Sequence, residues 1–255
     1  MSTVWDPHEQ HRGKTGSCKT DTTEIRMEEK MAELKVVEHF ISINGEGRKA
    51  GQLAHFVRFA GCNLACRYCD TRWANAADVP YESMGAGQIY ELLQKAGICN
   101  VTLTGGEPLL QEGIGELLDL LRREICFSVE VETNGAVELT PFLPDTGQDN
   151  VSFTMDYKLA GSGMEQKMLL SNYAHLRSCD TVKFVVGSVE ELIRCKEIMD
   201  RFHLIERGCG IFISPCFGQI DPAELVDYMA EQKWNHVNLQ LQLHKLIWDP
   251  DQRGV

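Results

Sequence analysis

Three cysteines stand close together in one short segment, at a spacing that suits a metal cluster. Cys62, Cys66 and Cys69 form a C-x3-C-x2-C pattern, while the other cysteines of the chain are scattered. Cysteine thiolates are the usual protein ligands of iron–sulfur clusters. Three such ligands bind three irons of a 4Fe–4S cubane and leave the fourth iron open to another molecule. We therefore interpret the segment as a 4Fe–4S site with one open iron.

Zinc and a buried structural cluster are the alternatives for these cysteines. Structural zinc sites need four ligands, usually in two C-x2-C halves, and the sequence offers no second half. Asn63, Arg67 and Tyr68 lie among the cysteines and make the segment a poor part of a hydrophobic core. A disulfide framework is not expected in a chain of 255 residues without a secretion signal. The iron–sulfur interpretation is favoured.

Composition points to a globular protein that acts on small molecules. The hydrophobic fraction of 43% and the charged fraction of 24% are ordinary, and the net charge of −12 argues against a nucleic-acid partner. No apolar run is long enough to span a bilayer, so we expect a cytoplasmic protein without membrane contact. Residues 1–33 are polar and lack periodicity, which predicts a disordered extension. Residues 34–255 are expected to form a single domain.

Apolar runs rich in β-branched residues alternate with segments of helical pattern. The predicted strands are 53–60, 98–103, 126–131, 151–155, 181–186, 210–213 and 236–241. The predicted helices are 87–96, 113–124, 189–202 and 222–232. Asp221 is a suitable N-cap for the last helix, and Pro222 suits its first position. This alternation predicts parallel strands joined by right-handed crossovers.

Polar or glycine-rich turns follow nearly every predicted strand. These turns are 61–70, 104–108, 132–135, 156–158, 187–188, 214–218 and 242–245. A flat, doubly wound sheet gathers functional residues near one switch point. A barrel brings the ends of successive strands to one mouth. We therefore predict an α/β fold, a partial (β/α)6-type TIM-like barrel with parallel strands and an active site at the C-terminal strand ends.

The cysteine pattern, with Tyr68 just before its last cysteine, resembles that of the radical S-adenosylmethionine (SAM) superfamily. Residues 104–108 (Thr-Gly-Gly-Glu-Pro), one strand later, are similar to the superfamily's GGE motif, which receives the SAM amine. Glycines suit this role because no Cβ keeps a ligand away from the backbone. The resemblance implies that the reduced cluster donates one electron to SAM, and that a 5′-deoxyadenosyl radical then removes a substrate hydrogen.

Four segments, spread over residues 36 to about 250, resemble the 7-carboxy-7-deazaguanine synthase family more closely. They are 40–47 (Phe-Ile-Ser-Ile-Asn-Gly-Glu-Gly), Arg58 before Cys62, 69–71 (Cys-Asp-Thr) and 240–245 (Gln-Leu-Gln-Leu-His-Lys). Asn44 stands where the family commonly has glutamine. The resemblance implies a carbon–nitrogen lyase of queuosine and deazapurine biosynthesis. Its reaction converts 6-carboxy-5,6,7,8-tetrahydropterin to 7-carboxy-7-deazaguanine with loss of ammonia.

The same resemblance implies residues for the substrate and for Mg2+. The implied substrate contacts are Ile43, Asn44, Gly45, Glu46, Arg58, Thr104, Gln242 and His244. Arg58 is expected to pair with the substrate carboxylate, because its planar fork suits a bidentate contact. Thr71 is expected to bind Mg2+, a hard cation that prefers oxygen ligands. Without the resemblance, Thr71 is more simply explained as a helix cap.

SAM is expected to contact the cluster segment and the later strand ends. The implied contacts are Tyr68, Cys69, Asp70, Gly105, Gly106, Glu107, Asp156, Tyr157, Lys158, Ser214, Pro215, Cys216 and Phe217. Residues 132–134 are further candidates. The family commonly has Ser-Pro-Lys where this chain has Asp-Tyr-Lys at 156–158, so only Lys158 carries over directly. Cys216 is not expected to bind the cluster, because a fourth thiolate blocks the iron that SAM needs.

A glycyl-radical-enzyme activase is the leading alternative, since it shares the cysteine pattern but acts on a protein backbone. Residues 44–47 and the pair Asp70 and Thr71 favour the synthase. An iron–sulfur or zinc carrier that never cleaves SAM is disfavoured by residues 105–107. The resemblance also implies a homodimer and an electron donor such as flavodoxin or ferredoxin.

Overall fold

A computed structural model describes residues 32–144, 149–249 and 252–255, all within one compact unit that spans Met31–Val255. Most of the predicted extension, residues 1–33, lies outside the described residues. Its last residue, Glu33, is the first residue of a strand rather than part of the extension. In the described part of the chain, no helix is long and apolar enough to cross a membrane.

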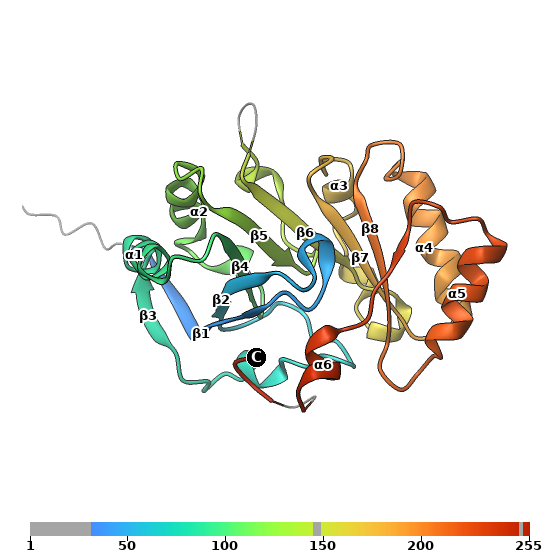
Figure 1. Cartoon of the computed structure of the whole chain (residues 1–255), viewed down its shortest axis with the longest axis horizontal. Helices are drawn as coiled ribbons and strands as arrows, with labels where there is room; N and C mark the ends of the chain where they lie inside the picture. The colour runs from blue at the N-terminus through green and yellow to red at the C-terminus, as the bar shows by residue number, and fades with distance from the viewer. Residues whose placement is uncertain (1–31, 145–148, 250–251) are drawn as a thin grey trace, which may run out of the picture. The chain divides into compact units, whose positions relative to one another are not determined.

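One curved sheet forms the centre of the unit (Figure 1). Its described strands are β1 (Glu33–Ile43), β2 (Leu53–Phe59), β3 (Glu82–Gly85), β4 (Asn100–Gly105), β5 (Ser128–Thr133), β6 (Val151–Tyr157), β7 (Thr181–Val186), β8 (Gly210–Pro215) and β9 (Asn238–Leu239). Their order in the sheet is β3-β1-β2-β4-β5-β6-β7-β8-β9. All neighbours from β2 to β9 are parallel, whereas β1 is antiparallel to both β2 and β3. The sheet does not close, which confirms the predicted partial barrel.

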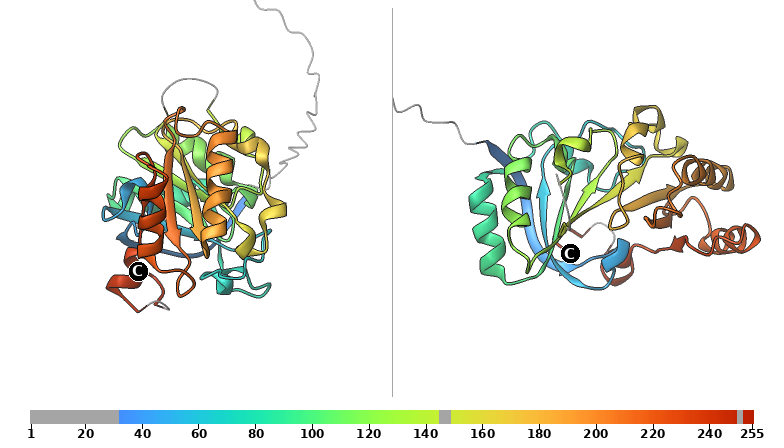
Figure 2. Two further views of the ribbon diagram at one scale, coloured as in Figure 1. Left: turned by 90° about the vertical axis from the view of Figure 1, so that its right-hand side faces the viewer. Right: turned by 90° about the horizontal axis from the view of Figure 1, so that it is seen from above.

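The longer helices cover the outer, convex face of the sheet (Figure 2). The described helices are α1 (Ala86–Ala96), α2 (Ile114–Arg122), α3 (Leu170–Tyr173), α4 (Val189–Arg201), α5 (Pro222–Glu231) and α6 (Leu243–Ile247). Short 3-10 helices are η1 (Gly47–Lys49), η2 (Arg72–Asn75), η3 (Pro108–Leu110), η4 (Thr140–Phe142), η5 (Ala160–Ser162) and η6 (Glu165–Lys167). α1, α2, α4 and α5 confirm the four predicted helices within two residues at each end. α3 and α6 were not predicted.

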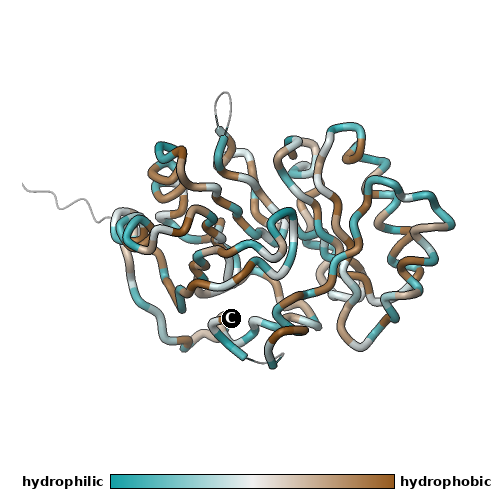
Figure 3. Tube along the Cα trace, viewed as in Figure 1, coloured by the Kyte–Doolittle hydropathy of each residue, from teal (hydrophilic) through white to brown (hydrophobic). Residues whose placement is uncertain are grey.

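The hydropathy pattern explains how the helices attach to the sheet (Figure 3). Ile89 and Leu93 stand one helical turn apart on α1, and both are fully buried. At the other end of the unit, the carboxylate of Asp221 accepts a hydrogen bond from the backbone N–H of Ala223 at 2.9 Å. This is the predicted N-cap of α5, and Pro222 follows it at the first helical position.

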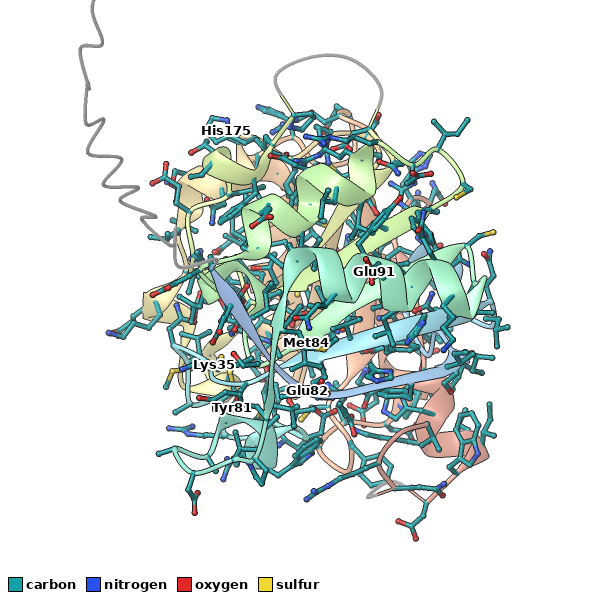
Figure 4. The ribbon with its side chains drawn as sticks, turned by 90° about the vertical axis from the view of Figure 1, so that its left-hand side faces the viewer. Lys35, Tyr81, Glu82, Met84, Glu91 and His175 are labelled. Atoms are coloured by element: carbon teal, nitrogen blue, oxygen red, sulfur yellow. The ribbon has the colours of Figure 1, made fainter. Side chains whose placement is uncertain are left out.

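The strands β1 and β3, which were not predicted, add an antiparallel edge to the parallel sheet. A bulge between Val36 and Glu38 interrupts the pairing of β1 with β2. The four-residue strand β3 forms the edge, and Figure 4 shows its Glu82 beside Tyr81 and Lys35. Nζ of Lys35 lies 5.4 Å from the centroid of the Tyr81 ring. A short, charged strand of this kind discourages pairing with another sheet edge.

The segment 44–52, which we call the floor loop, joins β1 to β2 and contains η1. It lies at the end of the sheet where the parallel strands begin, because β2 starts directly after it. In Figure 1 this blue segment extends from β2 towards β6 and β7. η1 contacts both β7 and β8. The loop therefore crosses the open barrel below the strand ends at which the active site is predicted.

Candidate active site

The three predicted cluster ligands follow β2, the first of the parallel strands. Beyond this strand, Gly61 has a φ of +84°, in the left-handed region that favours glycine. The turn carries the chain into residues 62–69, which we call the cluster loop. The three cysteines of this loop line one cavity of about 660 Å³, and Cys66 is buried. All three are free thiols, so they are available as ligands.

Nearby amide groups are directed at two of the sulfur atoms. Asn134 Nδ2 and the backbone N–H of Leu64 each donate to Cys62 Sγ at 3.4 Å. Asn75 Nδ2 donates to Cys69 Sγ at 3.9 Å. Burial raises the pKa of the Cys62 thiol, and the bonds from Leu64 and Asn134 act to lower it. Because a thiol must lose its proton to bind a metal, these donors favour the ligand form.

Within the described ranges, no three His, Cys, Asp or Glu side chains gather closely enough to hold a single metal ion. A structural zinc ion needs four ligands around one atom. A cubane presents a different iron to each of three thiolates, so its ligands stand further apart. Three thiols on one short loop are the ligand set of an iron–sulfur cluster with one open iron, whereas structural zinc needs a fourth ligand.

Gly105 and Gly106 end β4 directly against the start of the cluster loop. A Cβ built at Gly105 would lie 2.4 Å from the backbone N and O of Phe59, and one at Gly106 would lie 1.8 Å from the carbonyl oxygen of Gly61. The N–H of Gly106 donates to Phe59 O at 2.9 Å, and the N–H of Glu107 donates to Gly61 O at 2.8 Å. Both glycines line the cavity. We predicted that they admit a ligand, but here they first allow two backbone segments to touch.

Glu107, the acid of the GGE turn, lies beneath the cavity and does not line it. Its side chain is fully buried and accepts hydrogen bonds from Thr133 Oγ1 at 2.9 Å, from the N–H of Asn134 at 2.7 Å and from the N–H of Leu109 at 3.1 Å. Burial raises the pKa of Glu107 to about 7, although the hydrogen bonds act to lower it. In this structure Glu107 braces the end of β5, where Asn134 reaches Cys62.

A chain of charged side chains crosses the cavity from β6 to the floor loop. Lys158 Nζ lies 2.5 Å from Asp156 Oδ2. Lys183 Nζ lies 3.5 Å from Asp156 Oδ1 and 3.1 Å from Glu46 Oε2. Burial acts to raise the pKa of Asp156, but the two lysines outweigh it and hold that pKa below its ordinary value. Two lysines and two carboxylates therefore alternate along the cavity wall, in the order Lys158, Asp156, Lys183 and Glu46.

Several buried polar atoms beside the cavity have no hydrogen-bond partner among the described residues. They include the hydroxyl of Tyr68, Oδ1 of Asn75 and Nδ2 of Asn44. A buried polar group without a partner costs about 1–3 kcal/mol. Tyr68 and Asn75 lie near the cluster end of the cavity, and Asn44 belongs to the floor loop. These unpaired atoms are therefore available to hydrogen-bond a bound molecule.

The residues predicted to bind substrate all line this cavity. They are Ile43, Asn44, Gly45, Glu46, Arg58, Thr104, Gln242 and His244. Arg58 Nε donates to Glu38 Oε1 at 2.8 Å, across the β1–β2 ladder. A Cβ built at Gly45 would lie 2.7 Å from Nδ1 of His244. Glycine at this position therefore lets α6 pack directly on the floor loop.

Three of the residues predicted to contact SAM do not line the cavity. They are Glu107, Tyr157 and Ser214. Tyr157 alternates with Asp156 along β6, so its side chain faces the helices, and its hydroxyl donates to Glu165 Oε1 at 2.9 Å. Ser214 is buried below the cavity and donates to Glu46 Oε1 at 3.2 Å. The predicted SAM residues that do line the cavity are Tyr68, Cys69, Asp70, Gly105, Gly106, Asp156, Lys158, Pro215, Cys216 and Phe217.

The cavity also contains residues that sequence reasoning did not single out. They include Glu38, Phe56, Leu64, Trp73, Asn75, Thr154, Lys183, Val185, Gln219 and the segment 252–255. The rings of Phe40 and Phe56 stack with centroids 5.0 Å apart. Phe56 stands two residues before Arg58 on β2, so the strand period of two was a usable signal. Lys183 was a second signal, because it is an isolated cation in an apolar strand.

The predicted Mg2+ ligand, Thr71, also lines the cavity. It is the residue before η2, but its side chain makes no capping hydrogen bond there. Its Oγ1 lies 3.6 Å from Sγ of Cys69. The simple helix-cap explanation therefore does not account for this hydroxyl.

The chain is similar to known proteins over nearly its whole described length. Residues 56–157 match the radical SAM superfamily. A 7-carboxy-7-deazaguanine synthase of Clostridium acetobutylicum is 52% identical over 87% of this chain and 99% of the relative. Proteins of the same name from Chlorobaculum tepidum and Methanospirillum hungatei are 37% and 40% identical, over 88% and 85% of this chain and 98% and 86% of theirs.

Solved structures agree on the fold. QueE from Escherichia coli superposes with a TM-score of 0.65 at 23% identity, covering 82% of this chain and 94% of that chain. SuiB from Streptococcus suis superposes with a TM-score of 0.52 at 15% identity, covering 71% of this chain and 47% of that chain.

Proposed function

The chain belongs to the 7-carboxy-7-deazaguanine synthase family of radical SAM enzymes, and we propose that it converts 6-carboxy-5,6,7,8-tetrahydropterin to 7-carboxy-7-deazaguanine with loss of ammonia. Relatives that match the chain over nearly their full length carry the synthase name, and this favours the synthase over the activase alternative. The residues that the resemblance assigns to the substrate all line one cavity of this chain, which supports the proposal.

One observation carries the proposal, namely that the cysteines, the two glycines of the GGE turn and the family's substrate residues face a single cavity. Its volume of about 660 Å³ lies within the range of small-molecule sites. The cluster loop lies at the carboxyl ends of the strands, and the floor loop with His244 lies at the other end of the cavity. Arg58 is the next-to-last residue of β2 and faces the cavity between them. A cofactor held by the cluster loop would therefore share the cavity with a substrate held by Arg58 and the floor loop.

Cys62, Cys66 and Cys69 would hold the cluster, and Tyr68, Asn75 and the Gly105–Gly106 turn would hold SAM. When bound, the cluster and SAM supply a radical that removes one hydrogen atom from the substrate. The chain's own task is to orient the two molecules and to exclude water. The unpaired atoms of Tyr68 and Asn75 would complete their hydrogen bonds on the cofactor.

Arg58 would bind the substrate carboxylate. The ion pair with Glu38 engages Nε, on one side of the guanidinium, and holds the plane of the fork. The terminal nitrogens then remain available for the bidentate contact that planar carboxylates favour. Asn44 would contribute its unpaired Nδ2 to a ring acceptor of the same molecule.

Thr71 would bind Mg2+ together with oxygens of the substrate and water. Within the described ranges no cluster of carboxylates, histidines or cysteines offers a complete metal shell. A Mg2+ ion at Thr71 would therefore depend on substrate oxygens, as is usual for this cation. This arrangement would couple metal binding to substrate binding.

The proposal includes an electron donor such as flavodoxin or ferredoxin, a cytoplasmic location and a homodimer. These parts rest on the family resemblance. A chemical reductant can replace the donor in the test described next.

The test is anaerobic turnover of the reconstituted full chain with reductant, SAM, Mg2+ and the pterin. Mass spectrometry should detect both 5′-deoxyadenosine and 7-carboxy-7-deazaguanine. Arg58→Gln should keep its cluster but raise the KM for the pterin at least about tenfold, since a charged hydrogen bond contributes about 1.5–3 kcal/mol. SAM cleavage without pterin product in the wild-type chain would overturn the substrate assignment.

A further inference from the structure

The floor loop connects the substrate end of the cavity to the opposite wall of the barrel. Its residues Asn44, Gly45 and Glu46 line the cavity. Arg48 follows two residues later, in η1, and does not line the cavity. The side chain of Arg48 instead reaches the far wall, where β7 and β8 begin.

The Arg48 guanidinium donates to four acceptors on that wall. Nη2 donates to the carbonyl oxygens of Ser178 at 2.8 Å, Asp180 at 3.2 Å and Gly208 at 3.3 Å. Nε donates to Oγ1 of Thr181 at 3.3 Å. These acceptors belong to the turns before β7 and β8 and to the first residue of β7, so the sheet fixes their positions. A planar, always charged fork is suited to hold several such oxygens at once.

The wall also holds the cavity side of the loop through Glu46. Glu46 Oε2 accepts from Lys183 Nζ at 3.1 Å, and Glu46 Oε1 accepts from Gln240 Nε2 at 3.2 Å. Gln240 returns a bond, because its Oε1 accepts from the N–H of Gly47 at 2.8 Å. Arg48 therefore stands outside a network whose inner members face the cavity.

Close packing adds to the hold that Arg48 has on the wall. A Cβ built at Gly210, the first residue of β8, would lie 2.7 Å from Nε of Arg48. The guanidinium thus lies against bare backbone at the start of β8. A shorter side chain at position 48 would leave both the carbonyl oxygens and this surface without a partner.

We propose that Arg48 is a positioning residue for the pterin. Arg48 does not touch the substrate itself, but it holds the floor loop so that Asn44 and Glu46 face the cavity at fixed positions. This inference rests on the proposed function, because that function assigns the floor-loop end to the pterin. The cluster loop leaves the other end of the parallel strands. Loss of Arg48 should therefore affect the substrate end and spare the cofactor end.

The test compares Arg48→Ala with the wild-type chain in anaerobic turnover. The KM for the pterin should rise about tenfold, which corresponds to about 1.4 kcal/mol. Iron content, the KM for SAM and 5′-deoxyadenosine formation without pterin should stay unchanged. The ratio of 5′-deoxyadenosine to product should rise, because a displaced substrate receives the radical less often. Arg48→Lys keeps one charged donor and should give an intermediate KM.

Arg207→Ala is the matched control. Arg207 also donates to three carbonyl oxygens, those of Tyr173 at 3.0 Å, Ala174 at 2.9 Å and Leu176. It precedes Gly208, so it holds the same region of the wall without reaching the floor loop. Its loss should lower the unfolding midpoint but leave the pterin KM unchanged.

Each outcome decides the inference. An unchanged pterin KM in Arg48→Ala, or an equal rise in Arg207→Ala, overturns it. If Arg48→Ala does not fold, the KM of Arg48→Lys decides, and a wild-type value there overturns the inference. A wild-type chain that cleaves SAM but makes no product overturns the proposed function, and the inference falls with it. If the wild-type chain makes product and Arg48→Ala has the same pterin KM, the proposed function stands and only the inference about Arg48 fails.

Discussion

Gly106→Ala tests whether the contact between the GGE turn and the cluster loop is essential. Alanine at this position places a Cβ 1.8 Å from the carbonyl oxygen of Gly61 and 2.3 Å from its carbonyl carbon. Ordinary contact begins near 3.4 Å. The obstacle is backbone rather than a flexible side chain, so the start of the cluster loop must move.

The cost of this movement follows from the bonds that it breaks. The hydrogen bonds from Gly106 N to Phe59 O, at 2.9 Å, and from Glu107 N to Gly61 O, at 2.8 Å, cannot both survive. Each contributes about 1 kcal/mol, and overpacking adds about 1–3 kcal/mol. We expect a loss of about 3 kcal/mol in the free energy of unfolding. A displacement of about 1 Å at a reacting group lowers the rate about a hundredfold.

Urea unfolding, iron content and 5′-deoxyadenosine formation measure these effects. Gly115→Ala is the control, because a Cβ at Gly115 in α2 meets nothing within 4 Å. Alanine favours a helix by up to about 1 kcal/mol over glycine, so this variant should be as stable as the wild type or more so. Wild-type stability together with wild-type SAM cleavage in Gly106→Ala would refute the reasoning.

Three further predictions concern the cluster, the metal and the buried acid. Cys66→Ala should lose iron and all 5′-deoxyadenosine formation, and full activity in that variant would contradict the ligand role. Thr71→Ala should keep its iron but respond less to added Mg2+ in turnover assays, so an unchanged Mg2+ response would rule out this ligand. The raised pKa of Glu107, about 7 against an ordinary 4.5, means that its stabilising effect is present at low pH and is lost as pH rises towards 7. Between pH 4.5 and 7, the free energy of unfolding of the wild type should fall by about 3 kcal/mol more than that of Glu107→Gln, as measured by urea unfolding. The same pH dependence in both proteins would contradict this.

The parallel strands were predictable because burial on both faces leaves continuous apolar runs. β7 has the predicted bounds, Thr181–Val186, and α4 begins at the predicted Val189. β1 was missed for two physical reasons. Its bulge at Val36 breaks the period of two, and its partner β3 begins some forty residues later in the chain, at Glu82. The hydropathy pattern of a strand indicates which of its side chains are buried, but it does not indicate which distant strand it pairs with.

The candidate site was predictable wherever a short motif carried the residues. The cysteines and Arg58 lie in contiguous segments, and all of them line the cavity. Tyr157 was wrongly expected to contact SAM because the family's motif was matched position by position. Side chains alternate between the two faces of a strand, so Tyr157 points to the opposite face from Asp156. Arg48 was not found at all, since nothing in its neighbourhood in the sequence reveals that its acceptors lie on β7 and β8.

The partners of Arg48 also bear on the order in which the chain folds. Its bonds to Ser178 and Gly208 span 130 and 160 positions of sequence. Contacts of such separation form late, because the chain must first lose the entropy of a long loop. The cysteines at positions 62–69 are synthesised well before the wall that receives Arg48. We therefore expect the contacts between the floor loop and the starts of β7 and β8 to form late in folding, and pulsed hydrogen exchange at the Gly47 amide would time their formation.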